Sequence, residues 1–347
     1  MTSPISRLPA EWAPQDAVML TWPHADSDWR DMLERVEPVF VEIARAVTRF
    51  ETLLVVCHDA ALKAHVHSLL LKAGVDLARV RLHIAPSNDT WARDHGAITV
   101  IENDRPQPLS FVFNGWGGKF RAERDNAINA ALSSAGVFRQ PARELSLELE
   151  GGAIESDGEG TILTTSACLL NPNRNGGGLS REQAEAALFT HLGAQRVLWL
   201  NHGYLAGDDT DSHIDTLARL APADTIVYVG CADESDEHFA ALAAMKAELV
   251  ALRTGNDQPY RLLELPWPQA VYAEDGHRLP ATYANYLIIN GAVLVPIYAD
   301  AADERALQVI AEAHPGRAIV AIDCRPLIEQ HGSLHCVTMQ FPQGTLA

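Results

Sequence analysis

Strands and helices alternate in a repeating order along this chain, and that order constrains the fold more than any single motif does. Pairs of short apolar strands alternate with single amphipathic helices several times over. The units share no detectable residue identity. Alternation of this kind predicts an α/β architecture with structural repetition.

The spacing of apolar residues predicts the individual elements. Runs with three- and four-residue spacing predict helices at 28–50, 60–73, 123–135, 181–192, 237–252 and 303–313. Short apolar runs bounded by turn residues predict strands at 52–57, 79–84, 96–101, 109–113, 145–149, 153–156, 161–165, 196–200, 225–229, 286–289, 293–296 and 318–322. Most polar motifs fall at strand ends or in loops, where chemistry is usually placed on a rigid frame.

Size and charge limit the classes of protein that fit. No linker or charge block divides the chain, so we expect one domain over 1–347. The net charge of -18 disfavours nucleic acid, which needs clustered lysine and arginine, and also an anionic membrane surface. No run reaches the roughly 18 apolar residues of a membrane span. The acidic balance favours the approach of cations.

Cysteine usage indicates a reducing compartment. The five cysteines are widely spaced and form no CxxC pair, which disfavours a disulfide framework and a zinc knuckle. The first residues carry no apolar run typical of a signal peptide. We therefore expect a cytoplasmic protein.

The segment from Gly332 to Thr338 places the thiol of Cys336 directly after a Gly/Ser turn and a histidine. In one interpretation Cys336 is an attacking thiolate whose pKa a nearby imidazolium lowers below about 8.5. In the other it is a buried, inert cysteine on the last strand, the commonest fate of a free cysteine. Position alone favours neither interpretation.

His213 and Asp215 form an H-x-D pair, and on an extended strand residues two apart point the same way. We expect His213 to act as a general acid/base beside an anion that receives a cation. Glu150, at a glycine-permitted bend, is expected to orient the imidazole and stabilise its charged form. A surface pair and an edge-strand glutamate are the plainer alternatives. A metal site is disfavoured because the sequence has neither HExxH nor a second H-x-D.

Two aromatic motifs and an acidic loop are suited to a flat cation. Asp94 can bind a guanidinium through paired charge-assisted hydrogen bonds, with Trp91 as an apolar or cation-facing wall. Glycines around Trp116 suit a tight loop that brings backbone close to a ligand. In the acidic patch at 208–211 we assign Asp209 to a distal amine of the substrate. Taken alone, the Trp91–Asp94 motif and the acidic patch are better explained as ordinary surface, and the Trp116 segment can be a simple turn with an anchoring tryptophan.

Together and in this order, the motifs resemble the agmatine deiminase family, which is related to bacterial peptidylarginine deiminases among the guanidino-group-modifying enzymes. The likeness covers nearly the whole chain. It is carried by Pro9–Trp12, Leu20–Pro23, Trp91–Gly96, Phe113–Gly118, Glu150–Gly152, Asp157–Thr161, Asn171–Asn175, His213–Asp215 and His335–Thr338.

The resemblance implies a pentein fold, a five-bladed pseudo-symmetric α/β propeller around a central substrate funnel. It implies hydrolysis of agmatine to N-carbamoylputrescine and ammonia in polyamine metabolism, without a metal or organic cofactor. Its implied residues are Cys336 as nucleophile, His213 as acid/base, Glu150 orienting His213, Asp94 and Asp215 holding the guanidinium, and Trp91 lining the substrate. It also implies a symmetric homo-oligomer, with a dimer as our expectation.

The exact substrate stays open, because Ser333 and Leu334 stand where the family tends to have glycines. One alternative is deimination of peptidyl-arginine or another arginine-like compound, with Arg121 or Arg124 holding a carboxylate. Transfer of the amidine to an amine is a second alternative. A non-catalytic polyamine- or guanidine-binding protein is an alternative from a different class.

Overall fold

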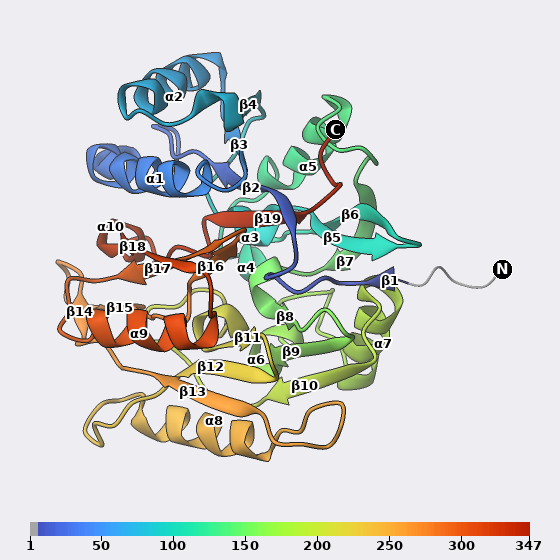
Figure 1. Cartoon of the computed structure of the whole chain (residues 1–347), viewed down its shortest axis with the longest axis vertical. Helices are drawn as coiled ribbons and strands as arrows, with labels where there is room; N and C mark the ends of the chain where they lie inside the picture. Colours follow the sequence, from blue (N-terminus) through green and yellow to red (C-terminus); the bar gives the residue numbers. More distant parts are fainter. Residues whose placement is uncertain (1–5) are drawn as a thin grey trace.

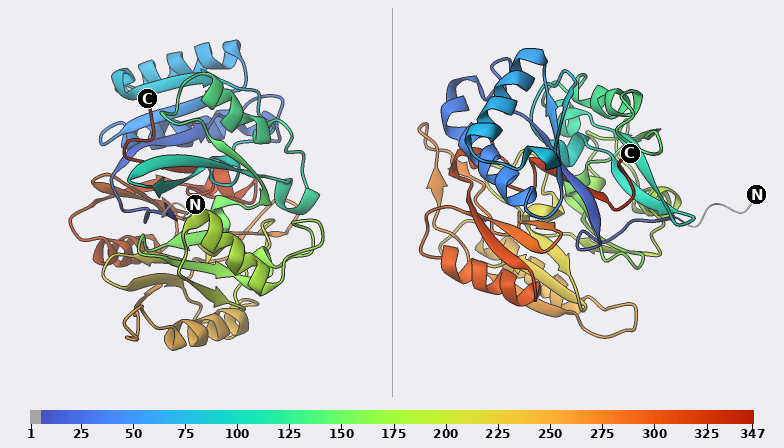
Figure 2. Two further views of the ribbon diagram at one scale, coloured as in Figure 1. Left: turned by 90° about the vertical axis from the view of Figure 1, so that its right-hand side faces the viewer. Right: turned by 45° about the horizontal axis from the view of Figure 1, so that its top comes forward.

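The computed structural model describes residues 6–347 and shows a mixed α/β architecture. Figure 1 shows the long helices toward the outside of the molecule and the short helices near its middle. Both Figure 1 and the left view of Figure 2 place the blue helix pair and the gold helix at opposite ends. No helix among the described residues is both long and apolar enough to cross a membrane.

Within residues 6–347 one structural unit occurs five times. In each unit, a first strand pairs antiparallel with a second, a helix follows, and a third strand pairs parallel with the second. The helix is the crossover that a parallel pair requires. The strands form separate sheets, and no closed sheet joins them in this part of the chain.

Four units are continuous in sequence. The first and second units are β5 (Ile98–Glu102), β6 (Arg105–Val112), α5 (Ile128–Ser134) and β7 (Arg143–Glu148), and then β8 (Ile154–Ser156), β9 (Thr161–Thr165), α7 (Arg181–Leu192) and β10 (Arg196–Leu200). The third unit consists of β11 (Ala218–Ala221), β12 (Thr225–Val229), α8 (Phe239–Ala251) and β13 (Arg261–Leu265). The fourth consists of β16 (Leu287–Ile289), β17 (Ala292–Ile297), α9 (Asp303–Ala313) and β18 (Ala318–Asp323). Strand β1 (Ser6–Arg7) extends the first of these sheets beside β5.

The fifth unit joins the two ends of the chain. Strand β19 (Thr338–Pro342) pairs antiparallel with β2 (Gln15–Thr21), which α1 (Leu33–Val47) connects to the parallel strand β3 (Thr52–Cys57). Helix α2 (Ala60–Lys72) leads to β4 (Val80–Ile84), the outer strand of this sheet. A short pair, β14 (Val271–Tyr272) and β15 (Arg278–Leu279), stands apart from the five units.

Short helices precede or connect the units. These are α3 (Ala92–His95), α4 (Gly115–Gly118), α6 (Ser166–Leu169), α10 (Arg325–Ile328) and the 3₁₀ turns η1 (Arg30–Met32), η2 (Leu77–Arg79), η3 (Asp125–Ala127), η4 (Gly151–Ala153) and η5 (Ile214–Thr216). Local chemistry explains several ends. Ser180 and Gln183 form a capping box that starts α7, and Gly193 in the left-handed conformation ends it.

The helices and most strands predicted from apolar spacing are confirmed, with ends that shift by a few residues. The predicted helix at 28–50 is η1 followed by α1, and the helix at 123–135 is η3 followed by α5. Strands β1, β2, β11, β13, β14 and β15 were missed, and β19 was expected only as a last strand without bounds. The mixed α/β class is confirmed, whereas the sheets do not by themselves establish a propeller.

The segment that enters the first strand of each unit occupies an equivalent place in all five units. Asp94 precedes β5, Glu150 precedes β8, His213 and Asp215 precede β11, and Cys336 precedes β19. The remaining segment, before β16, carries Asn285. Each of the five units therefore carries one short segment with polar side chains directly before its first strand.

Candidate active site

A cavity of about 140 Å³ brings together five of the residues predicted from the sequence: Trp91, Asp94, Trp116, Asp209 and Cys336. Further carboxylates on its lining come from Asp28 and Asp89, and Phe120, His331 and Gly332 also line it. The lining contains no lysine or arginine from the described part of the chain. The cavity is therefore shaped by aromatic rings and acidic groups, with one thiol.

Asp94 is held on both carboxylate oxygens. The amide of Gly152 donates to Oδ1 at 3.1 Å, and the indole Nε1 of Trp116 donates to Oδ2 at 2.9 Å. The pKa of Asp94 is raised well above its ordinary value, first by burial and then by the charges of Asp215 and Glu150. A bound cation would reverse that effect, so the empty site favours a positive ligand beside Asp94.

Asp215 presents one bound and one free oxygen. Its Oδ2 lies 2.7 Å from Nδ1 of His335, while its buried Oδ1 has no hydrogen-bond partner among the described residues. Burial would raise the pKa of Asp215, but the hydrogen bond and charge of His335 outweigh it, so the pKa is lowered. An ionised carboxylate with a free buried oxygen is a built acceptor for an N–H donor.

Cys336 is fixed by two neighbouring segments. Asn285 Oδ1 accepts from the amide of Cys336 at 3.3 Å and from its Sγ at 3.4 Å. The carbonyl of Cys336 accepts from the amide of Arg93 at 3.1 Å, which ties the thiol to the helix that carries Asp94. Asn285 had no motif around it and was missed in the sequence.

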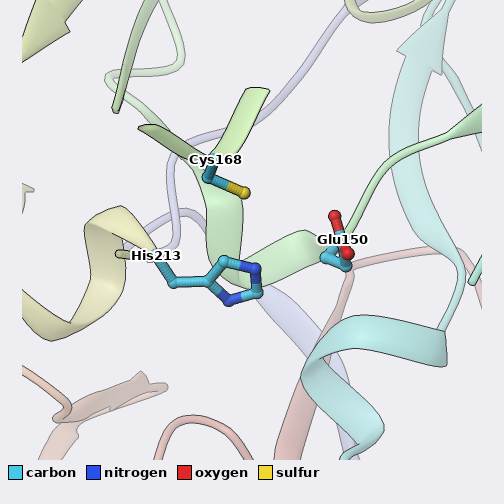
Figure 3. Close-up of side chains that lie close together, drawn as sticks. All are labelled: Glu150, Cys168 and His213. Atoms are coloured by element: carbon cyan, nitrogen blue, oxygen red, sulfur yellow. The ribbon is translucent and has the colours of Figure 1, made fainter. Parts of the chain in front are cut away.

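His213 lies beside Asp94, with its Nδ1 3.6 Å from Asp94 Oδ1. Its ring, a carboxylate oxygen of Glu150 and Sγ of Cys168 lie within 4.8 Å of one another, and Figure 3 shows the three side chains around one space. The buried Nε2 of His213 and Oε2 of Glu150 have no hydrogen-bond partner among the described residues. Glu150 is therefore close to His213, as predicted, without a hydrogen bond to it.

Arg174 is a further buried member of this region that sequence reasoning did not single out. Its Nε donates to Glu150 at 2.8 Å and its Nη1 to Asp211 at 2.7 Å. The donors of Glu150, Cys168 and His213 are types that zinc accepts. The charge of Arg174 opposes a metal cation there, so proton transfer fits these residues better than metal binding.

The pKa shifts of Cys336 and His213 run against the charged forms expected from the sequence. The pKa of the Cys336 thiol is raised well above its ordinary value, first by burial and then by the charges of Asp215 and Asp94. Burial also lowers the pKa of His213 to about 3, despite the opposing charge of Asp215. The site thus holds a thiol and a neutral imidazole, rather than the thiolate and imidazolium expected from the sequence.

The H-x-D pair does not lie on a strand. His213 precedes the 3₁₀ turn η5, which contains Asp215. A Cβ placed on Gly152 would lie 2.5 Å from Nδ1 of His213, 3.0 Å from Oδ1 of Asp94 and 3.2 Å from Oδ2 of Asp215. The side chains of His213, Asp94 and Asp215 therefore converge on Gly152. A glycine is needed there because it lets these side chains come close to the backbone, and not because the backbone has a positive φ.

The tryptophans are placed by glycines, as predicted for Trp116. Trp116 has a φ of 54°, and Gly115, Gly117 and Gly118 around it also have positive φ. Trp91 lies against Gly332, where an added Cβ would approach the ring to 2.1 Å. The ring centroids of Trp91 and Trp116 are 6.4 Å apart, edge to face. Together they form an aromatic wall of the cavity.

Of the acidic patch at 208–211, only Asp209 has its carboxylate free to serve the cavity. Asp208 accepts from Thr210 and Ser212 within its own loop, and Asp211 pairs with Arg174 and Lys119. Asp209 is therefore the carboxylate of this patch that lines the cavity, and its assignment to an amine of the substrate stays a prediction. Arg121 and Arg124 do not line the cavity among the described residues, which removes their predicted part in binding a carboxylate there.

Comparisons with known proteins agree on one family. The family model described as Porphyromonas-type peptidyl-arginine deiminase matches residues 7–342. An agmatine deiminase from Stutzerimonas stutzeri (strain A1501) is 32% identical over 358 residues, with 96% of this chain and 95% of that protein covered.

Solved structures give the same picture. A protein from Porphyromonas gingivalis, named provisionally as an arginine deiminase, is 53% identical, with a TM-score of 0.92 over 99% of this chain and all (100%) of that one. A cysteine-to-serine variant of C. jejuni agmatine deiminase with substrate bound is 38% identical, with a TM-score of 0.90 over 99% of this chain and 98% of that one.

Proposed function

The chain belongs to the Porphyromonas-type peptidyl-arginine deiminase family, and from this premise we propose that it hydrolyses agmatine to N-carbamoylputrescine and ammonia. The observation that carries the proposal is a buried thiol in an acidic, aromatic cavity, under the influence of two carboxylates, of which Asp94 lines the cavity and Asp215 is buried. Cys336 and Asp94 line that cavity, and the charges of Asp94 and Asp215 act on the thiol. The substrate-bound C. jejuni relative, an agmatine deiminase with a cysteine replaced, supports this choice of substrate and residue type.

Binding follows from the fixed carboxylates. The guanidinium plane takes Asp94 on one side and the free Oδ1 of Asp215 on the other, which satisfies the buried oxygen. The butyl chain packs along Trp91 and Trp116. The terminal ammonium lies toward Asp209, so both charges of agmatine meet carboxylates. The absence of a lysine or arginine from the described lining favours agmatine over free arginine, whose carboxylate would have no cation there.

The first chemical step forms a carbon–sulfur bond. The substrate cation offsets the charges that hold the Cys336 thiol protonated, and the thiol proton passes to neutral His213. The thiolate attacks the central guanidinium carbon. The His213 imidazolium then gives its proton to one nitrogen, and the carbon–nitrogen bond breaks to release ammonia. A covalent thiouronium remains on Cys336.

The second step returns the enzyme to its starting state. His213, neutral again, takes a proton from water, and the resulting hydroxide adds to the thiouronium carbon. The carbon–sulfur bond breaks as the His213 imidazolium gives its proton to the sulfur. The hydroxyl group of the adduct loses its proton to solvent, and the ureido product leaves. Glu150, close to the ring, keeps the imidazole orientation in both steps. No metal or organic cofactor enters this scheme.

Ammonia release from agmatine, free arginine and a blocked arginine peptide tests the substrate directly. We expect turnover of agmatine to exceed that of free arginine by at least about 100-fold, because an unpaired buried carboxylate is costly. A preference for the blocked peptide would favour the alternative of peptidyl-arginine deimination. The family description and the P. gingivalis relative give that alternative its support.

Replacing Gly152 by alanine is expected to lower kcat/KM for agmatine at least about 100-fold. The new methyl group would meet His213 Nδ1 at 2.5 Å and Asp94 Oδ1 at 3.0 Å, so the two groups must separate. A misplacement of about 1 Å costs a factor of this size. Steady-state ammonia release measures the effect.

Gly255→Ala is the matched control, because a Cβ at Gly255 meets nothing within 4 Å and the residue has no positive φ. Both variants should fold, with circular dichroism spectra like that of the parent. Parental kinetics in the Gly152→Ala enzyme would mean that this glycine is not the point on which the site converges.

Alkylation of Cys336 reports the raised pKa of its thiol. In substrate-free enzyme, we expect the rate with iodoacetamide to rise about tenfold per pH unit from about pH 7 to 9, without a plateau near the ordinary thiol value of about 8.5. The pKa of Cys336 is raised because burial and the charges of Asp215 and Asp94 disfavour the thiolate, so the alkylation rate keeps rising with pH. Peptide mass spectrometry follows the modification, with free cysteine as the reference. A plateau below pH 8 would contradict the description of the empty site.

The wider expectations from the sequence are part of this proposal. We propose that the five units form the blades of a pentein propeller, since five equivalent segments then meet at one axis. Their contacts support this, because α3 packs on η4 and η4 packs on η5. A single domain, a homodimer and a cytoplasmic location stay predictions.

A further inference from the structure

Beneath the proposed guanidinium site lies a buried row of charged side chains that the mechanism has not used. Arg219 pairs with Glu155 through Nε and donates from Nη2 to Glu11 Oε2 at 3.0 Å. The same Glu11 oxygen lies 2.7 Å from Nε2 of His335. The row ends at Asp215, whose Oδ2 lies 2.7 Å from Nδ1 of His335.

The position of His335 fits a ring that donates from both of its nitrogens. Each of its two ring nitrogens faces a carboxylate oxygen at 2.7 Å. A neutral imidazole has one N–H and would turn a lone pair toward one of these anions. An imidazolium donates to both. Arg219 Nη2 lies 3.1 Å from Nε2 of His335, and Glu11 Oε2 accepts from both cations, which lets them lie this close.

Glu11 and the backbone of His335 are each held by a further hydrogen bond. Glu11 Oε1 accepts from the amide of Ile288 at 2.7 Å, which fixes the carboxylate against β16. The backbone of His335 is held by Asn285, whose Oδ1 accepts from the His335 amide at 2.9 Å. The imidazole therefore bridges two buried carboxylates from distant parts of the chain, Glu11 and Asp215.

We propose that Glu11 and His335 are positioning residues for the deimination: Glu11 keeps His335 doubly protonated, and this imidazolium holds Asp215 ionised with its free Oδ1 available to the guanidinium. The inference rests on the proposed function for its catalytic consequence. It gives a reason for the acidic residue in Pro9–Trp12, which the sequence motif did not explain.

Other charged side chains near Glu11 and His335 also influence how the site responds to pH. Arg93, Arg219 and Glu155 face Glu11 and His335, and Asp94, His213 and Arg219 face Asp215. Arg93 and Arg219 remain cations over the working range. Neutralising Glu11 therefore removes the anion that favours a charged His335, and Asp215 loses its nearest cation.

The protonation state of His335 can be read without turnover. In enzyme labelled with ¹⁵N-histidine, the resonances lost in His335→Gln identify the ring. At pH 8 we expect both nitrogens of His335 to be protonated in the parent enzyme. A neutral His335 at pH 8 would overturn the proposal, whatever substrate the enzyme turns over.

The kinetic consequence is tested with Glu11→Gln. At about pH 6 we expect kcat/KM for agmatine to fall 10- to 100-fold, as for other residues that orient a site from behind. The acid limb of the kcat/KM profile should move up by about one pH unit, since a less stabilised Asp215 carboxylate takes a proton more readily. Glu11→Asp keeps the charge and should leave that limb within about 0.3 units of the parent.

Glu51→Gln is the matched control. Glu51 is a buried carboxyl that accepts from the amide of Asn290 at 2.7 Å and contacts neither His335 nor Asp215 through a hydrogen bond. It should leave the acid limb unmoved. Glu11 would have only a structural role if the acid limb of the kcat/KM profile were the same in Glu11→Gln as in the parent, or if Glu51→Gln shifted that limb by the same amount. Loss of all turnover in the parent would refute the deiminase proposal, while the NMR result would still decide the state of His335.

Discussion

Cys336→Ala abolishes release of ammonia from agmatine, with a loss of roughly 10⁴-fold or more, as expected for removal of a covalent nucleophile. The thiol lines the cavity beside Asp94, and its amide and sulfur are both fixed by Asn285. Alanine leaves the two carboxylates in place. The variant should therefore still bind agmatine, which isothermal titration measures, while steady-state ammonia release disappears.

Mass spectrometry separates loss of chemistry from loss of folding. Parent enzyme quenched during turnover should carry the added mass of a thiouronium, whereas the Cys336→Ala protein should carry none. Cys57→Ala is the matched control, because Cys57 is a buried thiol at the end of β3, away from the cavity lining. It should retain parental turnover. Parental turnover in Cys336→Ala would end the covalent mechanism.

The repeating order of elements was predictable because helices whose apolar residues recur every three or four positions alternate with short strands that carry apolar runs. The count of five was not, since one unit is assembled from β19 at the end of the chain and β2 near its beginning. Strand β2 is buried along most of its length and was nevertheless missed. Its apolar run was a usable signal.

The site was predictable where a motif surrounded the residue. Trp91, Asp94, Trp116, Asp209 and Cys336 line the same cavity, although they come from four separate parts of the sequence. Arg174, Asn285 and His335 act through hydrogen bonds to residues far along the chain, such as the bonds from Arg174 to Glu150 and Asp211. A pairing of that kind leaves no local pattern in one sequence.

The pKa shifts of His213 and Cys336 differ most from what the sequence led us to expect, and burial is the reason. Sequence reasoning placed a charged histidine beside a thiolate, but it had no measure of burial. Burial of His213 and Cys336 disfavours both charged forms, and the carboxylates near the sulfur add to the effect. Charge separation within this pair is therefore coupled to the arrival of the substrate cation.

His213→Ala lowers kcat for agmatine by about 10²–10⁴-fold, because the ring takes the thiol proton, protonates the leaving ammonia and activates water. Its pKa of about 3 in the empty site means that the variant removes a neutral base and no resident charge. Agmatine binding should therefore change little, and the loss should fall on kcat more than on KM. Stopped-flow detection of ammonia and steady-state kinetics measure both quantities.

His314→Ala is the matched control for the loss of a buried imidazole. His314 is equally buried, its pKa is also lowered to about 3, and its Nε2 contacts the hydroxyl of Tyr286 at 3.3 Å, away from the cavity lining. We expect it to lower thermal stability while kcat stays within about threefold of the parent. Equal loss of kcat in the two variants would show that His213 supports the fold and takes no part in proton transfer.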